Sequence, residues 1–187
     1  MLKRRSKHKL AKLLPIDAPA TYLAPQGRAP QQILVEEAHS CGEHIASTKT
    51  KLICPPPIGE VGTALLTGAL SMGGDATIYS DLSRADATIP EGAVVKECDQ
   101  DCVAEVLASV GHIWVMPPAF ADLERYLELW IASGFKPLVC ISPRDEFLLL
   151  RGFVQEIVSA GSPRIAERLI FSRTPEEGWE SLSELLA

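Results

Sequence analysis

Short apolar runs alternate with longer segments of helical periodicity along most of the chain. The runs predict six strands, at residues 51–54, 76–80, 93–96, 112–116, 137–142 and 168–172. The longer segments predict helices at residues 31–46, 62–72, 99–109, 119–133, 145–160 and 176–186. Strands separated by helix-length segments need crossover connections, so the pattern predicts a mainly parallel sheet.

Two of the predicted strands are apolar almost throughout. Residues 112–116 read HIWVM, and residues 138–142 read LVCIS. Strands of this kind are buried on both faces, and right-handed crossovers place helices on both sides of the sheet. The predicted fold class is therefore α/β, a three-layer, doubly wound sheet of P-loop-like or Rossmann-like type.

The first thirty residues differ from this pattern. Residues 1–14 are basic, and residues 15–30 contain Pro15, Pro19, Pro25 and Pro30. Such a segment predicts an extended linker. We therefore expect a basic tip and Pro-rich linker at 1–30, contributing little to the core, and a single α/β domain at 31–187.

Charge is distributed unevenly between the tip and the rest of the chain. Six of the 18 lysine and arginine residues lie within the first twelve positions, whereas all 24 acidic residues lie from Asp17 onward. An acidic body is a poor general surface for nucleic acid. The tip has two interpretations: a contact with nucleic acid or an anionic membrane surface, or an ordinary solvated tail.

No run approaches the roughly 18 to 20 apolar residues of a membrane helix, and the basic start lacks the features of a secretory signal. Five cysteines show no metal-binding spacing, because three residues separate Cys98 from Cys102. We expect a cytoplasmic protein with reduced thiols and no metal.

A glycine-containing loop follows the first predicted strand. The segment 54–70 reads CPPPIGEVGTALLTGAL. Gly59 lies just before the predicted helix over residues 62–72, and Gly62 lies at its start. Backbone N–H groups at a helix start, together with the helix dipole, suit a phosphate. Because glycine lets a ligand approach the backbone closely, the loop predicts a nucleotide-type site.

Three interpretations of this loop remain open. As a Walker A loop it has Thr63 at the lysine position and Ala64 at the magnesium-ligand position. As a dinucleotide fingerprint it lacks the first glycine, although Asp81 follows the next strand where a ribose-binding acid is expected. In the third interpretation it is a tight turn that needs glycine for its geometry alone.

Several segments resemble the ParA/MinD family of P-loop ATPases. The segment ATIYSDLSRADAT resembles the family's second strand and its exit, and GEVGTALLTGAL stands where the family has its phosphate loop. HIWVMPP resembles the Walker B strand, and PLVCISPRDEFLLLRGFVQEIVSAG with RLIFSRTP resembles the late strand–helix–strand unit. The family's Walker B aspartate falls at Val115 or Met116, and its asparagine at Ser172, whereas Arg173 is retained.

The resemblance implies a degenerate ParA/MinD-like binding or accessory protein with a protein partner, active in plasmid maintenance or DNA mobilisation and not an efficient ATPase. Two alternatives stay open: an NAD(P)-binding Rossmann-type oxidoreductase or sensor, and an interaction domain with no small ligand. The cofactor would be ATP, ADP or NAD. The residues expected to bind it are Gly59, Gly62, Thr63, Asp81 and Arg173, and no catalytic residue is predicted.

Overall fold

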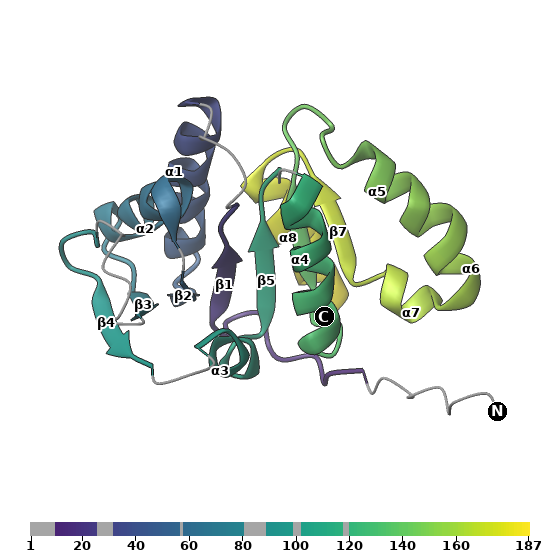
Figure 1. The fold of residues 1–187 in the computed structure, drawn as a ribbon, viewed down its shortest axis with the longest axis horizontal. Helices are drawn as coiled ribbons and strands as arrows, with labels where there is room; N and C mark the ends of the chain where they lie inside the picture. Colours follow the sequence, from purple (N-terminus) through teal and green to yellow (C-terminus); the bar gives the residue numbers. More distant parts are fainter. Residues whose placement is uncertain (1–9, 26–31, 57, 81–88, 99–101, 118–119) are drawn as a thin grey trace.

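The computed structural model describes residues 10–25, 32–56, 58–80, 89–98, 102–117 and 120–187. Within them the chain forms one sheet of seven parallel strands in the order β4-β3-β2-β1-β5-β6-β7. Figure 1 shows the strands from β4 at one edge to β7 at the other. The strands are β1 (Ala20–Leu23), β2 (Leu52–Cys54), β3 (Ala76–Ser80), β4 (Val94–Glu97), β5 (His112–Val115), β6 (Leu138–Ile141) and β7 (Leu169–Ser172).

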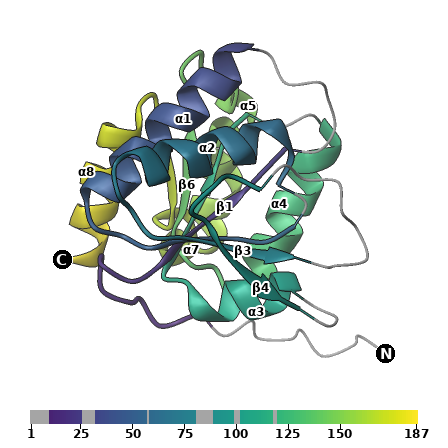
Figure 2. The same cartoon turned by 90° about the vertical axis from the view of Figure 1, so that its left-hand side faces the viewer.

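Helices connect the strands and cover both faces. They are α1 (Gln32–Ser47), α2 (Gly59–Ser71), α3 (Cys102–Ser109), α4 (Phe120–Ala132), α5 (Leu148–Phe153), the π-helix η1 (Val154–Val158), α6 (Ser159–Gly161), α7 (Pro163–Ala166) and α8 (Pro175–Leu186). One core cluster joins the sheet to α1, α2 and α8, and another joins it to α4 and α5. Figure 2 shows α8 and α4 on opposite sides of the strands. The three-layer α/β fold and its parallel sheet are thus confirmed.

The central strand lies in the segment that the sequence predicted to be a linker. β1 pairs with β5 from Ala20↔His112 to Leu23↔Val115, and with β2 at Ala20↔Leu52. Its four residues are buried. The linker assignment is therefore wrong for residues 20–23, and this part of 1–30 belongs to the core.

The error has a physical explanation. Pro19 and Pro25 flank an apolar run of only a few residues, and proline usually marks turns or strand ends. Here Pro19 precedes the strand and Pro25 follows it, so neither removes an N–H group that the ladder needs. The basic residues 1–9 lie outside the described part of the chain, and the expectations for them stay predictions.

Two glycines allow α1 and α2 to pack with their backbones in contact. A Cβ atom added to Gly42 in α1 would overlap the carbonyl oxygen of Leu65, and one added to Gly68 in α2 would overlap that of His39. Figure 2 shows the two helices side by side. Ala38, Cys41 and Ile45 form the buried side of α1.

The expected helix over residues 145–160 begins later and is not uniform. It starts at Leu148, and Asp145 lies before it with a left-handed φ of 58°. From Val154 to Val158 the chain is a π-helix, and the N–H group of Ser159 donates to the carbonyl oxygen of Val154. α5, η1 and α6 therefore form one continuous helical segment, residues 148–161.

Cys98 and Cys102 form a disulfide, which corrects the expectation of five reduced thiols. Their Cα atoms lie 5.6 Å apart, within the range that a disulfide spans. The bond ties the end of β4 to the first residue of α3. Cys41, Cys54 and Cys140 are free thiols and are buried.

No helix in the described part of the chain is long and apolar enough to cross a membrane.

Candidate functional site

The strand order reverses direction between β1 and β5. From β1 the chain builds the sheet outward through β2, β3 and β4, and from β5 it builds outward through β6 and β7. In doubly wound sheets ligands bind at such a reversal, in the crevice expected outside the carboxyl ends of the two central strands. Here those ends are Ala24–Pro25 and Met116–Pro117.

Arg125 of α4 reaches the end of β1. Its Nη1 atom donates to the carbonyl oxygen of Ala24 at 3.3 Å, and the side chain is half-buried. α4 follows β5, so this contact joins the elements on the two sides of the strand-order reversal. A guanidinium group is a permanent positive charge with several donors, and it suits a ligand with oxyanion groups.

The start of α2 lies against the same end of β1. A Cβ atom on Gly62 would come within 3.3 Å of the Cβ atom of Ala24 and would overlap the side chain of Ile58. Ile58 is the N-cap residue of α2, and no side chain caps the helix. The first-turn N–H groups and the helix dipole therefore favour an anion at this end of α2.

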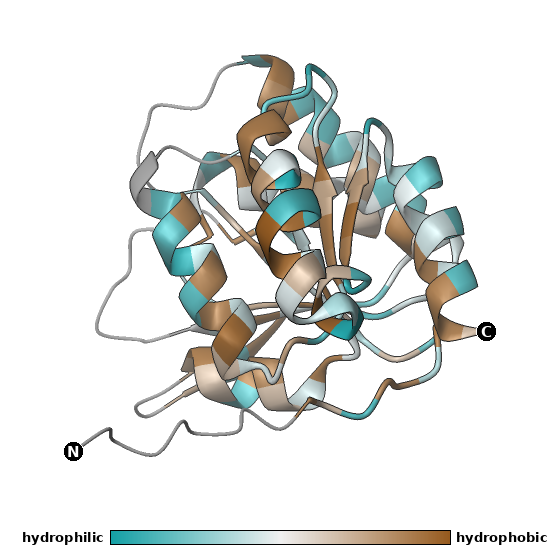
Figure 3. Cartoon of the chain, turned by 90° about the vertical axis from the view of Figure 1, so that its right-hand side faces the viewer, coloured by the Kyte–Doolittle hydropathy of each residue, from teal (hydrophilic) through white to brown (hydrophobic). Residues whose placement is uncertain are grey.

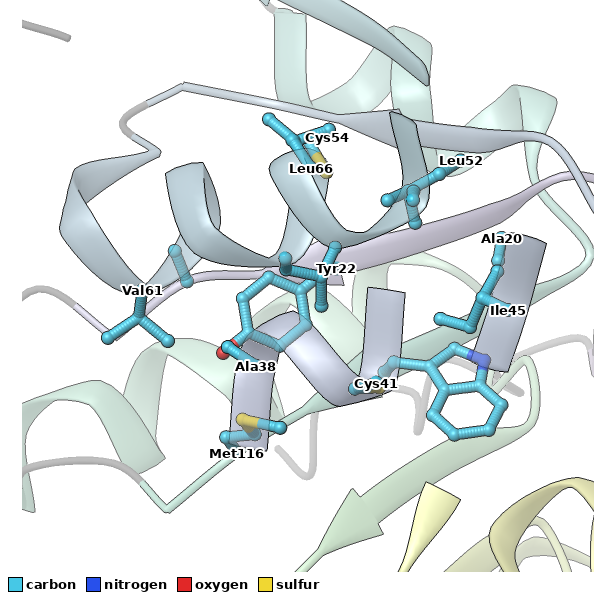
Figure 4. Close-up of a cluster of buried hydrophobic side chains, with 14 of the residues drawn as sticks. Ala20, Tyr22, Ala38, Cys41, Ile45, Leu52, Cys54, Val61, Leu66 and Met116 are labelled. Carbon is cyan, nitrogen blue, oxygen red and sulfur yellow. The ribbon is translucent and has the colours of Figure 1, made fainter. Parts of the chain in front are cut away.

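A buried tyrosine hydroxyl lies between these elements. Tyr22 of β1 is only 1% exposed, and its hydroxyl has no hydrogen-bond partner among the described residues. Figure 4 shows the hydroxyl pointing toward Ala38, between Val61 of α2 and Met116 at the end of β5. An unpaired buried hydroxyl costs about 1–3 kcal/mol, so it indicates a missing partner such as a water molecule or a ligand.

Both tyrosines near the crevice are neutral. Burial raises the pKa of Tyr22 well above its ordinary value, and the nearby Tyr126 raises it further. Burial also raises the pKa of Tyr126 in α4, whose hydroxyl has no described partner either. Each hydroxyl therefore keeps its proton and is available as a hydrogen-bond donor.

The structure brings together three of the five residues predicted to bind a cofactor. Gly59, with a left-handed φ of 59°, Gly62 and Thr63 lie in the first turns of α2. The Thr63 hydroxyl donates to the carbonyl oxygen of Gly59 at 2.8 Å. Asp81 lies outside the described residues.

Arg173 is not near this loop. It follows β7, and the strands β1, β5 and β6 separate β7 from β2. Its Nη2 atom forms an ion pair with Asp145 at 2.8 Å. The glycine-containing loop follows β2, because the sequence did not predict β1. A dinucleotide fingerprint lies in the first βα turn of its fold, and this loop is not that turn. Ligand binding at these positions stays a prediction.

Sequence reasoning missed Tyr22, Arg125 and Tyr126. Tyr22 was assigned to the linker, and the two α4 residues showed no motif that separates them from an ordinary helix. The available signal was the apolar run ATYLA between Pro19 and Pro25, which is long enough for a short buried strand.

The thiols at the sheet do not favour nucleophilic chemistry. Burial raises the pKa of Cys54, at the end of β2, to about 12, so it carries no thiolate at neutral pH. Burial likewise raises the pKa of Cys41 and Cys140. No cluster of three metal-ligating side chains occurs among the residues with described positions.

Comparison with known proteins gives a consistent structural match. No protein-family model matches the chain, and no curated protein matches it. Among solved structures, the molybdenum cofactor binding protein from the phototrophic bacterium Rippkaea orientalis has a TM-score of 0.66 at 14% identity, over 91% of this chain and 98% of that one. The molybdenum cofactor carrier protein from Chlamydomonas reinhardtii has a TM-score of 0.67 at 13% identity, over 90% of this chain and 98% of that one.

These neighbours overturn the resemblance to ParA/MinD ATPases. The chain shares its fold with proteins that bind or carry a cofactor, and the P-loop assignment and the role in plasmid maintenance or DNA mobilisation are wrong. The alternatives of an NAD(P)-binding oxidoreductase or sensor and of an interaction domain without a ligand do not match these neighbours either. The resemblance was misleading because strand–loop–helix units of many doubly wound proteins share apolar strands and glycine-containing turns.

Proposed function

We propose that this protein binds a molybdenum cofactor, or a closely related phosphorylated pterin, in the crevice between β1 and β5 and carries it without transforming it. The observation that carries the proposal is the buried Tyr22 hydroxyl, which has no partner among the described residues and lies beside the uncapped start of α2. The solved neighbours support the ligand class, because their names describe binding or carrying this cofactor. The sequence identity to these two proteins is 13–14%, which supports a shared fold, and the ligand is tested by the experiments below.

The residues at the crevice fit such a ligand. The cofactor carries a terminal phosphate, which needs positive charge and N–H donors. Arg125 supplies the charge, and the first turn of α2, including Gly59, supplies backbone N–H groups. Tyr22 would supply one hydrogen bond from its buried hydroxyl.

The same residues favour binding over catalysis. Cys54 is held as a thiol by its raised pKa, and Tyr22 keeps its proton for the same reason of burial. General acid–base chemistry needs a group whose pKa lies near the working pH. The groups described at the crevice are better suited to holding a ligand in place.

A carrier must also release its ligand to an acceptor. We therefore propose a protein partner that receives the cofactor, and we place this exchange in the cytoplasm. The basic residues 1–9 are outside the described part of the chain and carry no part of this proposal.

Co-purification tests the proposal directly. The full chain is produced in cells that synthesise the cofactor and is purified without oxygen. Bound pterin is then measured by fluorescence after oxidation, and bound molybdenum is measured by elemental analysis. We expect the wild-type protein to retain both at a substantial fraction of one equivalent.

Two arginine variants localise the site. Arg125→Gln is expected to lower the retained pterin by about tenfold, since a lost charge-assisted contact is worth about 1.5–3 kcal/mol. Arg173→Gln is the matched control, because Arg173 lies beyond β6 at the far edge of the sheet. A wild-type protein that retains neither pterin nor molybdenum would show that the proposed function is wrong.

A further inference from the structure

Strand β4 is held at the edge of the sheet with little help from the core. All four of its residues are exposed, and none of them belongs to a core cluster of the described residues. At the opposite edge, three of the four residues of β7 are buried. Figure 3 views the molecule from the side of β7 and shows hydrophobic residues along the strands there. Unlike β7, β4 is therefore not fixed by the burial of its own side chains.

The contacts between β4 and β3 are weak ones. The backbone ladder runs only from Thr77↔Val94 to Ser80↔Glu97. The Nζ atom of Lys96 lies 5.5 Å from the ring centroid of Tyr79, and a cation–π contact at an exposed site contributes little. Segments with few buried apolar contacts and solvent-exposed backbone hydrogen bonds open locally far more often than the whole protein unfolds. β4 has these features.

The disulfide between Cys98 and Cys102 ties the end of β4 to a fixed point. Side chains alternate along a strand, so Cys98 lies on the same face as Lys96, which is the face of Tyr79. Cys102 is the first residue of α3, is 6% exposed and packs in a core cluster with Tyr79. Figure 2 shows β4 and α3 next to each other. The bond therefore links an exposed strand to a buried helix residue.

The other three cysteines do not exchange with this pair. Cys41, Cys54 and Cys140 are buried free thiols, and burial raises the pKa of each. A thiol must lose its proton before it attacks a disulfide, so these three are inert at neutral pH. Cys98 is only partly buried, so a reductant in solution reaches the bond from its side.

We infer that Cys98 and Cys102 form a reversible redox switch, which fastens β4 to α3 when oxidised and lets β4 leave the edge of β3 when reduced. The two cysteines are only four positions apart, so the bond restricts the unfolded chain little and acts mainly as a local tether. The switch is independent of the proposed cofactor, because β3 and β2 separate β4 from β1.

The chemistry is thiol–disulfide exchange with a dithiol reductant. One thiolate of the reductant attacks the Sγ atom of Cys98, the S–S bond breaks, and Cys102 leaves as a thiolate that takes up a proton. Because Cys102 begins α3, the N–H groups of the first turn favour the negative charge on the leaving sulfur. The second thiolate of the reductant then displaces Cys98. The reductant ends as a disulfide, and two electrons and two protons pass to the pair.

Hydrogen exchange of the full chain, followed by mass spectrometry, tests the switch. The protein is equilibrated with glutathione disulfide, and one half is then reduced with dithiothreitol. Alkylation after unfolding should count three free thiols before reduction and five after it. Reduction should make backbone exchange in β4 and at its partners in β3 about tenfold faster or more, whereas exchange in β6 should not change.

Cys98→Ser separates the bond from any other effect of the reductant. This variant should exchange in β4 as the reduced wild-type protein does, with or without dithiothreitol. Val94→Ser is the matched control, because Val94 is 56% exposed in the same strand and its replacement keeps the bond, so the response to dithiothreitol should remain.

Three results would overturn the inference. The first is five labelled thiols after treatment with glutathione disulfide, which would mean that the bond does not form. The second is a bond that dithiothreitol reduces only after the chain has been unfolded. The third is complete reduction, or Cys98→Ser, with exchange in β4 as slow as in the oxidised wild-type protein.

Discussion

The Nε1 atom of Trp114 donates a hydrogen bond of 2.8 Å to Nδ1 of His112, two residues earlier in β5. The accepting nitrogen must be unprotonated, and His112 is completely buried. Burial lowers the pKa of His112 from 6.5 to about 4, although the nearby carbonyl groups of Ile16 and Ala18 oppose the shift. This histidine is therefore neutral in the folded protein at physiological pH.

Acidification should destabilise the protein through His112. Between pH 6.5 and 4 the unfolded chain takes up a proton that the folded chain does not, so the free energy of unfolding falls as the pH falls. This difference in the pKa of His112 corresponds to a loss of roughly 3 kcal/mol at most in the free energy of unfolding. The loss is complete only below pH 4. Urea unfolding at a series of pH values measures the slope.

His112→Gln should flatten this dependence, because an amide oxygen can still accept from Trp114 but does not titrate. His39→Gln is the control, since His39 is well exposed beside Glu43 on α1. If His112→Gln keeps the wild-type slope, His112 is not the group responsible.

Gly42→Ala should be strongly destabilising. The new Cβ atom would overlap the carbonyl oxygen of Leu65, and a helix backbone cannot move aside as a side chain can. We expect a loss of about 3 kcal/mol, at the upper end of overpacking costs, measured by thermal or urea unfolding. Gly161→Ala is the matched control, because its Cβ atom would meet nothing within 4 Å and should stabilise slightly.

Lys136 should matter for the end of α3. Its buried ammonium group donates to the carbonyl oxygens of Leu107, in the last turn of α3, and of Val110, which follows the helix. Lys136→Met would leave these carbonyl groups without that donor, so we expect the free energy of unfolding to fall by about 2 kcal/mol. Lys49→Met, at an exposed lysine, should change it little; an equal loss in both variants would contradict this role for Lys136.

Tyr22→Phe separates folding from binding. Removing a buried hydroxyl without a described partner should leave the stability of the ligand-free protein unchanged or raise it by about 1 kcal/mol. The retained pterin should fall at the same time, if the hydroxyl contacts the cofactor. Thermal unfolding and the pterin assay give the two values, and a clear loss of stability would show that the hydroxyl already has a partner.

The sequence predicted most of the helices and the strands of β2 to β7, because most of these elements carry long or strongly apolar patterns, although β4 is short and exposed. The strand 112–116 is apolar at nearly every position, and the structure places β5 there. β1 was not predicted because it has only four residues and prolines lie close to both of its ends. Its burial comes from pairing with β2 on one side and β5 on the other. Local pattern says little about such a strand, whose environment is set by segments far along the chain.

The candidate site was predicted only in part for the same reason. Gly59, Gly62 and Thr63 lie within five positions of one another, so the sequence alone identifies them as one segment. In the structure they lie together in the first turns of α2. Arg173 could not be placed without the strand order, which puts it at the opposite edge. The contact between Arg125 and Ala24 joins residues about 100 positions apart, and only the fold brings them together.

The central position of β1 has a consequence for synthesis of the chain. Among the described strands β1 is synthesised first, and β2 to β4 can extend the sheet from one of its sides as they follow. The other side has no partner until β5, which begins only at His112, has been translated. During that interval the nascent half-sheet presents an unpaired apolar edge, the kind of surface that attracts other strands or a chaperone. Pausing of translation before β5 should therefore promote aggregation, whereas pausing after it should not.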